Sequence, residues 1–171
     1  MNDDTTEPAS APEPRPLGTV VVAVSQSASS QRAVEWTSHL AAPLGSTVVA
    51  VHVLTFNEEF LKDGLTPDTM RTWRREREAL LRDHWLRPLA EAGVDHSHRM
   101  VEANTIDEGV LACAAQAHAD AIVIGSGRTG GLLGRVTHAS SSRLTHHAQQ
   151  PVIVVPTGWT PLTPAQRARR I

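Results

Sequence analysis

The chain has 171 residues, of which 40% are hydrophobic and 20% are charged, and its formal net charge is -2. This length and composition predict one globular domain with a proper core. The small net charge argues against nucleic acid or an acidic membrane as a partner. The single cysteine, Cys113, excludes an internal disulfide and fits a reducing, cytoplasmic location. No apolar run approaches the ~20 residues that a helix needs to cross a bilayer.

The two ends of the chain differ in composition from the middle. Residues 1–16 lack the basic start and apolar centre of a secretory signal and are rich in Asp, Glu, Thr, Ser and Pro, so we expect a disordered tail. The ordered domain is expected over residues 17–156. Residues 157–171 contain proline and arginine and are expected to be loosely held. A tryptophan within them, Trp159, is a candidate for docking onto the domain or a partner.

Apolar β-branched runs alternate with amphipathic stretches through the middle of the chain. Uninterrupted apolar runs are typical of strands that are covered on both faces, as in parallel sheets. Five strands are predicted: 18–24, 47–54, 95–102, 121–124 and 151–155. Four helices are predicted between them: one from Ser29 or Ser30 to about 43, one from Thr66 to about Arg87, then 105–118 and 139–148. Alternation of this kind predicts a doubly wound parallel sheet with helices on both faces.

A glycine-rich segment, Gly125 to Arg135, follows the predicted fourth strand. In open parallel sheets, ligands bind beyond the carboxyl ends of strands where the strand order reverses. If the first and fourth strands are neighbours, that place lies between Ser25 and Gly125. Glycines there let backbone N–H groups approach phosphate oxygens, and a following helix adds its positive end. The segment lacks the Gly-Lys-Ser/Thr of a Walker loop, so a phosphate cradle and a set of tight turns remain equal alternatives.

Other catalytic and metal-binding patterns are missing from the sequence. The nine histidines are not completed by a cysteine or paired carboxylates at ligand spacing, so no metal site is predicted. No G-x-S-x-G elbow is present, and no metal-binding carboxylates or general base lie near the glycine-rich segment. We therefore expect a protein that is not an enzyme. The arginines between 71 and 77 alternate with acids, which favours a salt-bridged surface helix over nucleic-acid binding.

Three segments follow a known family pattern without a gap: Ala119–Ser126, Gly130–Leu132 and Arg143–Val152. Through them the chain resembles the universal stress protein family. The resemblance implies a three-layer α/β/α fold with a five-stranded parallel sheet in the order 3-2-1-4-5 and two helices on each face. It also implies a homodimer, often formed by pairing of the last strand, here Val152–Val155. An apolar edge strand that stays unpaired is an aggregation hazard, so this pairing is physically reasonable.

ATP-binding members of the family have a loop that reads Gly, two residues, Gly, nine residues, Gly, then Ser or Thr. On this chain the resemblance places the first Gly on Gly125, the second on Arg128, the third on His138 and the Ser or Thr on Ala139. Those members also end the first strand with an Asp that holds the adenine–ribose end of the ligand. That position is Ser25 here, so four defining positions are changed.

Other positions keep the family pattern. Val53 matches the apolar residue that lines the adenine pocket, Ser141 matches a phosphate-facing serine, and Ser126 follows the retained Gly125. The changed residues alter the chemistry, because Ser25 has no charge to hold a sugar hydroxyl and Arg128 enters left-handed backbone space less readily than glycine.

The resemblance therefore implies a non-catalytic, cytoplasmic stress-response protein that acts by dimerisation and binding of protein partners, with a degenerate nucleotide site and no cofactor. The alternative is a switch that binds ATP or another nucleotide through Gly125, Val53, Ser141 and a recruited Arg128. The side chain of Arg128 separates these hypotheses. The site is closed if the guanidinium folds into it and pairs with a carboxylate, and binding is retained if a cleft stays open above Gly125.

Overall fold

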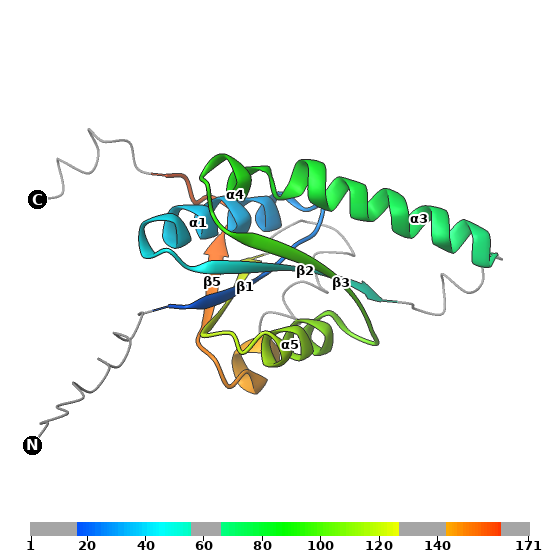
Figure 1. Ribbon diagram of the computed structural model, residues 1–171. Helices are drawn as coiled ribbons and strands as arrows, with labels where there is room; N and C mark the ends of the chain where they lie inside the picture. The colour runs from blue at the N-terminus through cyan, green and yellow to red at the C-terminus, as the bar shows by residue number, and fades with distance from the viewer. Residues whose placement is uncertain (1–16, 56–65, 127–142, 162–171) are drawn as a thin grey trace, which may run out of the picture.

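The computed structural model describes residues 17–55, 66–126 and 143–161, and these form a three-layer α/β/α domain (Figure 1). Its five strands are β1 (Thr19–Ala23), β2 (Thr47–Thr55), β3 (His96–Ala103), β4 (Ala121–Ser126) and β5 (Val152–Pro156). All pairings are parallel and the order is β3-β2-β1-β4-β5. The predicted strand order is confirmed, and each predicted strand lies within two residues of its observed bounds.

Helices cover both faces of the sheet. The described helices are α1 (Ala28–Leu44), α3 (Pro67–Leu80), the π-helix η1 (Leu81–Trp85), α4 (Arg87–Glu91), α5 (Ile106–Gln116) and a helical turn over 143–147. Figure 1 shows α1, α3 and α4 on one face and α5 on the other. None of the helices among these residues is long and apolar enough to span a membrane.

The start of α1 differs from the prediction. Ser27, in extended backbone, is the N-cap, and its Oγ accepts a hydrogen bond from the N–H of Ser30. The predicted caps Ser29 and Ser30 are already inside the first turn, where both are buried. The N-cap is the residue directly before the first helical residue. Because α1 begins earlier than predicted, the turn between β1 and α1 is one or two residues shorter than the sequence indicated.

The long second helix is interrupted where one continuous helix was predicted. The N–H of Leu86 donates to the carbonyl of Leu81, the i to i+5 bond of a π turn, and α4 begins anew with Pro88 in its first turn. The first turn of a helix tolerates proline, because the backbone N–H that proline lacks would have no intrahelical partner there. Leu81 and Trp85 within the π turn are buried, whereas Leu80 directly before it is 37% exposed.

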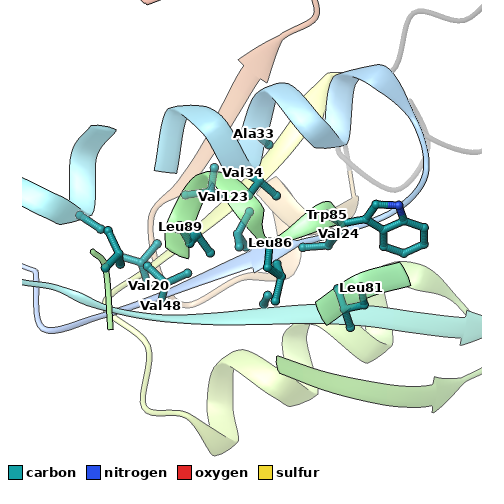
Figure 2. Packing of buried hydrophobic residues seen from close by; sticks show 14 of the residues in the cluster. Val20, Val24, Ala33, Val34, Val48, Leu81, Trp85, Leu86, Leu89 and Val123 are labelled. Atoms are coloured by element: carbon teal, nitrogen blue, oxygen red, sulfur yellow. The ribbon is translucent and has the colours of Figure 1, made fainter. Parts of the chain in front are cut away.

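Two apolar clusters stabilise the fold, one on each side of the sheet. Alternate residues of a strand face opposite sides, so Val20 and Val22 pack beneath α1 and α4, whereas Val21 packs beneath α5. Figure 2 shows the first cluster, in which Leu81 and Leu89 are fully buried. Burial of each such side chain contributes about 1.5–3 kcal/mol. This two-sided burial explains the continuous valine runs in the sequence.

The segment after β5 is attached to the domain. Thr157 Oγ1 donates a hydrogen bond of 2.9 Å to the carbonyl of Ser126. The Trp159 ring packs against the first cluster and lies 5.8 Å from the His39 ring, centroid to centroid. Of the two docking surfaces considered for Trp159, the structure therefore places it on the domain.

Candidate functional site

Four serines gather where β1 ends and α1 begins. The N–H of Ser25 donates to Ser30 Oγ at 2.7 Å, and Ser27 Oγ lies 3.0 Å from Ser25 Oγ and 3.2 Å from Ser29 Oγ. The positive end of the α1 dipole lies at the same place. This turn therefore presents hydroxyl donors and acceptors, together with a positive partial charge, at the carboxyl end of the central strand.

Gly125, near the end of β4, packs directly on this turn. A Cβ added at Gly125 would lie 2.2 Å from the carbonyl oxygen of Ser29 and 2.8 Å from the nitrogen of Ser30. The glycine therefore allows the first turn of α1 to rest on β4 at backbone contact distance. This requirement is independent of any phosphate.

The end of β2 supplies an apolar wall. Val53 lies against Gly109 of α5 so closely that a Cβ on Gly109 would be 2.6 Å from Val53 Cγ1. Ile106 and Val110 of α5 lie beside it on the same wall. The absence of a side chain at Gly109 thus allows the close contact between Val53 and the backbone of α5.

His52 precedes this wall and has a defined tautomer. Its Nδ1 lies 2.8 Å from the carbonyl oxygen of Val24, and because a carbonyl only accepts, Nδ1 is the protonated nitrogen. Burial, the largest effect, lowers the pKa of His52 below its ordinary value. The hydrogen bond to Val24 opposes this effect and the charge of Arg77 adds to it. The imidazole also meets the Trp85 ring edge-on, 5.2 Å between centroids.

These residues enclose one cleft at the carboxyl ends of β1, β2 and β4. Its cavity volume is about 100 Å³, smaller than the range of about 300–1,000 Å³ for small-molecule sites, so among the described residues the cleft encloses only part of such a ligand. The walls are apolar, and the polar groups among the described lining residues are the four serine hydroxyls, His52 and backbone atoms. A cleft of this kind can hold a flat apolar ring system that has hydroxyl or amine groups at one edge.

The structure brings together three of the predicted site residues. Ser25, Val53 and Gly125 all line the cleft, whereas Ser126 lies at the end of β4 and its carbonyl is bonded to Thr157. The predicted residues Arg128, His138 and Ser141 lie outside the described residues, so the position of Arg128 does not yet separate the two hypotheses.

Sequence reasoning missed Ser27, Ser29, Ser30 and His52 as lining residues. The density of serine directly after the first strand was the available signal. Arg143, which follows the glycine-rich segment, lies with its Nη1 3.9 Å from Oδ1 of the mostly buried Asp107. Within residues 17–55, 66–126 and 143–161, no three His, Cys, Asp or Glu side chains are grouped as metal ligands.

Comparisons with known proteins agree on the family. The model of the universal stress protein family matches residues 16–156. No curated protein matches the chain. A universal stress protein family structure from Burkholderia pseudomallei is 25% identical, with a TM-score of 0.64 over 81% of this chain and 96% of that one.

Two further structures resemble the fold at lower identity. A universal stress protein in complex with cAMP is 21% identical, with a TM-score of 0.61 over 83% of this chain and 98% of that one. The universal stress protein from Archaeoglobus fulgidus in complex with dAMP is 19% identical, with a TM-score of 0.57 over 83% of this chain and 99% of that one.

Proposed function

Because the chain belongs to the universal stress protein family, we propose that it is a non-catalytic, cytoplasmic stress-response protein whose cleft binds an adenine nucleoside or nucleotide as a regulatory ligand. The supporting observation is the cleft itself, which lies between apolar walls and a rim of serine hydroxyls. Two proteins of similar fold were crystallised with cAMP and dAMP, ligands that share the adenine ring and a phosphate.

The chemistry of the cleft matches such a ligand. Val53 and Val110 offer a flat apolar surface to a base, and the hydroxyls of Ser25 and Ser27 pair with sugar hydroxyls or the base edge. The Ser25 hydroxyl holds a ribose less tightly than the family's carboxylate, since hydrogen bonds to charged groups are stronger. We therefore propose weaker binding than an Asp at this position would give, and no chemical step.

A homodimer through Val152–Val155 is part of the same proposal. β5 lies at the edge of the sheet, and Val154 on this strand is 41% exposed. Pairing with the same strand of a second copy would satisfy the free backbone groups of the edge and cover that valine.

Calorimetric titration of the nucleotide-free protein with ATP, AMP and cAMP tests ligand binding. We expect at least one Kd below about 100 μM, roughly -5.5 kcal/mol. Ile106→Trp, at the half-buried edge of the cleft, should abolish binding by filling the space. Leu80→Trp adds the same ring on the exposed side of α3 and should bind as the unchanged protein does. Equal binding by all three proteins would show that the ligand lies elsewhere.

The second candidate function is action through protein partners alone, with an eroded site. The observation in its favour is Ser25, which stands where ATP-binding members have an Asp. The Arg128→Gly, His138→Gly, Ala139→Ser variant restores the family loop. Binding of ATP by this variant and not by the unchanged chain would support the eroded site and reject the regulatory ligand.

A further inference from the structure

A second hollow lies between α1 and the segment from η1 to α4, and α1 and α4 pack side by side in the same layer of the domain (Figure 1). Its cavity volume is about 520 Å³, within the range of about 300–1,000 Å³ for ligand sites. Gln31, Glu35 and His39 of α1 line it, together with Pro88 and Glu91 of α4. We call it the α1–α4 groove. It is separate from the cleft, because the two have no described lining residue in common.

The chain itself arrives at this groove after β5. The N–H of Trp159 donates to the carbonyl of Pro156 at 2.9 Å and closes a turn. The Trp159 side chain packs against the first apolar cluster, and its ring contacts the ring of His39, a lining residue of the groove. Residues 162–171 therefore begin three residues after a side chain that touches the edge of the groove.

The groove is short compared with the reach of residues 162–171. Gln31 and His39 are eight residues apart in α1, so the lining stretch of this helix is about 12 Å long. An extended chain advances by up to about 3.3–3.6 Å per residue, so the chain from Trp159 to Arg167 spans up to about 26–29 Å. The segment is therefore long enough to pass along the whole groove.

The charges of the segment and the groove are complementary. The segment has no acidic residue and contains three arginines: Arg167, Arg169 and Arg170. The lining residues of the groove include two glutamates and one arginine. Arg32 Nη1 lies 2.7 Å from Oε2 of Glu35, and Arg87 Nε lies 3.4 Å from Oε1 of Glu91. Each of these pairs uses one oxygen of a carboxylate that has about four acceptor sites, so both glutamates can accept a further guanidinium.

We propose that residues 162–171 bind in the α1–α4 groove of their own chain, with their arginines paired to Glu35 and Glu91. The groove is more accessible to this segment than to a separate molecule, because tethering beside His39 gives the segment an effective concentration of about millimolar order. Charge pairs that are individually weak in water then suffice to hold it. The bound segment covers this face of α1 and α4.

Digestion of the full-length chain with trypsin tests this inference, since the arginines of the segment are cleavage sites for this protease. Mass spectrometry follows cleavage after residues 167, 169 and 170, and a synthetic peptide of residues 158–171, digested under the same conditions, gives the rate without the groove. We expect the chain to be cut about tenfold more slowly than the peptide, as for a groove that is occupied about nine-tenths of the time.

Two matched variants locate the protection. Glu35→Gln with Glu91→Gln should raise the cleavage rate close to that of the peptide. Glu76→Gln with Glu108→Gln replaces two exposed glutamates outside the groove and should leave the protection unchanged. Rising salt should speed cleavage of the unchanged chain relative to the peptide, because it screens the exposed pairs.

Three results would overturn the inference. Cleavage of the unchanged chain at the rate of the peptide would show that the segment is not bound. Full protection in the Glu35→Gln, Glu91→Gln variant would show that it is bound elsewhere. Protection that increases with protein concentration would assign it to the groove of a second copy, since binding within one chain does not depend on concentration. These outcomes do not depend on the proposed function, because no nucleotide takes part in the experiment.

Discussion

Replacement of Gly125 by alanine should destabilise the protein severely, because the new methyl group would collide with backbone. The added Cβ would lie 2.4 Å from the carbonyl carbon of Ser29 and 2.2 Å from its oxygen. Carbon atoms make favourable contact at about 3.5 Å, so the first turn of α1 would have to retreat by roughly 1 Å.

A retreat of this size would break two hydrogen bonds of the β1–α1 turn. One joins the N–H of Ser25 to Ser30 Oγ at 2.7 Å, and the other joins Ser30 Oγ to the carbonyl of Ala23 at 3.3 Å. Overpacking costs about 1–3 kcal/mol and each lost hydrogen bond costs about 1 kcal/mol. The expected loss in the free energy of unfolding is therefore about 3–5 kcal/mol.

Urea denaturation at constant m-value measures this loss, and Gly109→Ala is the matched control. Its Cβ would lie 2.6 and 2.7 Å from the two γ-methyls of Val53, a β-branched side chain with little rotamer freedom, although alanine favours the helix by up to about 1 kcal/mol. We expect a loss of about 1–2 kcal/mol for Gly109→Ala, smaller than that of Gly125→Ala because the contact is with a side chain and not with backbone. A Gly125→Ala protein as stable as the unchanged chain would refute the packing argument. If the argument holds, loss of nucleotide binding in Gly125→Ala would not by itself indicate a phosphate contact.

Two other predictions concern pH and assembly. Because the folded-state pKa of His52 is lowered, the unfolded chain binds the proton more readily, and stability should fall as the pH decreases below about 6.5. As the pH falls, the urea midpoint of His52→Gln should decrease less than that of the unchanged chain. The surface variant His147→Gln should show the same decrease as the unchanged chain. An equal decrease in all three proteins would contradict the role of His52. Val154→Glu, on the β5 edge, should give monomers in sedimentation equilibrium, and Ser97→Glu, on the opposite edge strand, should not. A persistent Val154→Glu dimer would place the interface elsewhere.

The sequence predicted the layers of the fold well because two-sided burial leaves an unmistakable pattern. Val20, Val21 and Val22 are all fully buried, so their run excludes an exposed face. The strand order came from the family resemblance and not from the runs themselves. Pro88 predicted a kink or an end around Arg87, where α4 indeed begins, but nothing in the sequence placed the π turn at Leu81, since Leu81 and Trp85 keep a spacing that an α-helix also allows.

The site was harder to predict than the strands that support it. Ser25, Val53 and Gly125 were found because they occupy family positions at strand ends. Ser29 and Ser30 were missed because their place on the cleft depends on where α1 begins, and the cap was assigned too late in the chain. The hydrogen bond from Arg77 to Gln26 brings α3 over the β1–α1 turn, a contact across 51 residues of sequence that no local pattern predicts.

The π turn determines how α3 is rotated about its helix axis. An i to i+5 bond accommodates one residue more than the i to i+4 bonds on either side, so Leu81–Trp85 works as a built-in insertion of one residue. Deleting that residue would restore regular winding and rotate α3 by about 100° relative to α4. Arg77 would then leave Gln26, while Leu89 of α4 could stay buried. The number of residues between Leu81 and Leu86 therefore sets which side of α3 faces the β1–α1 turn.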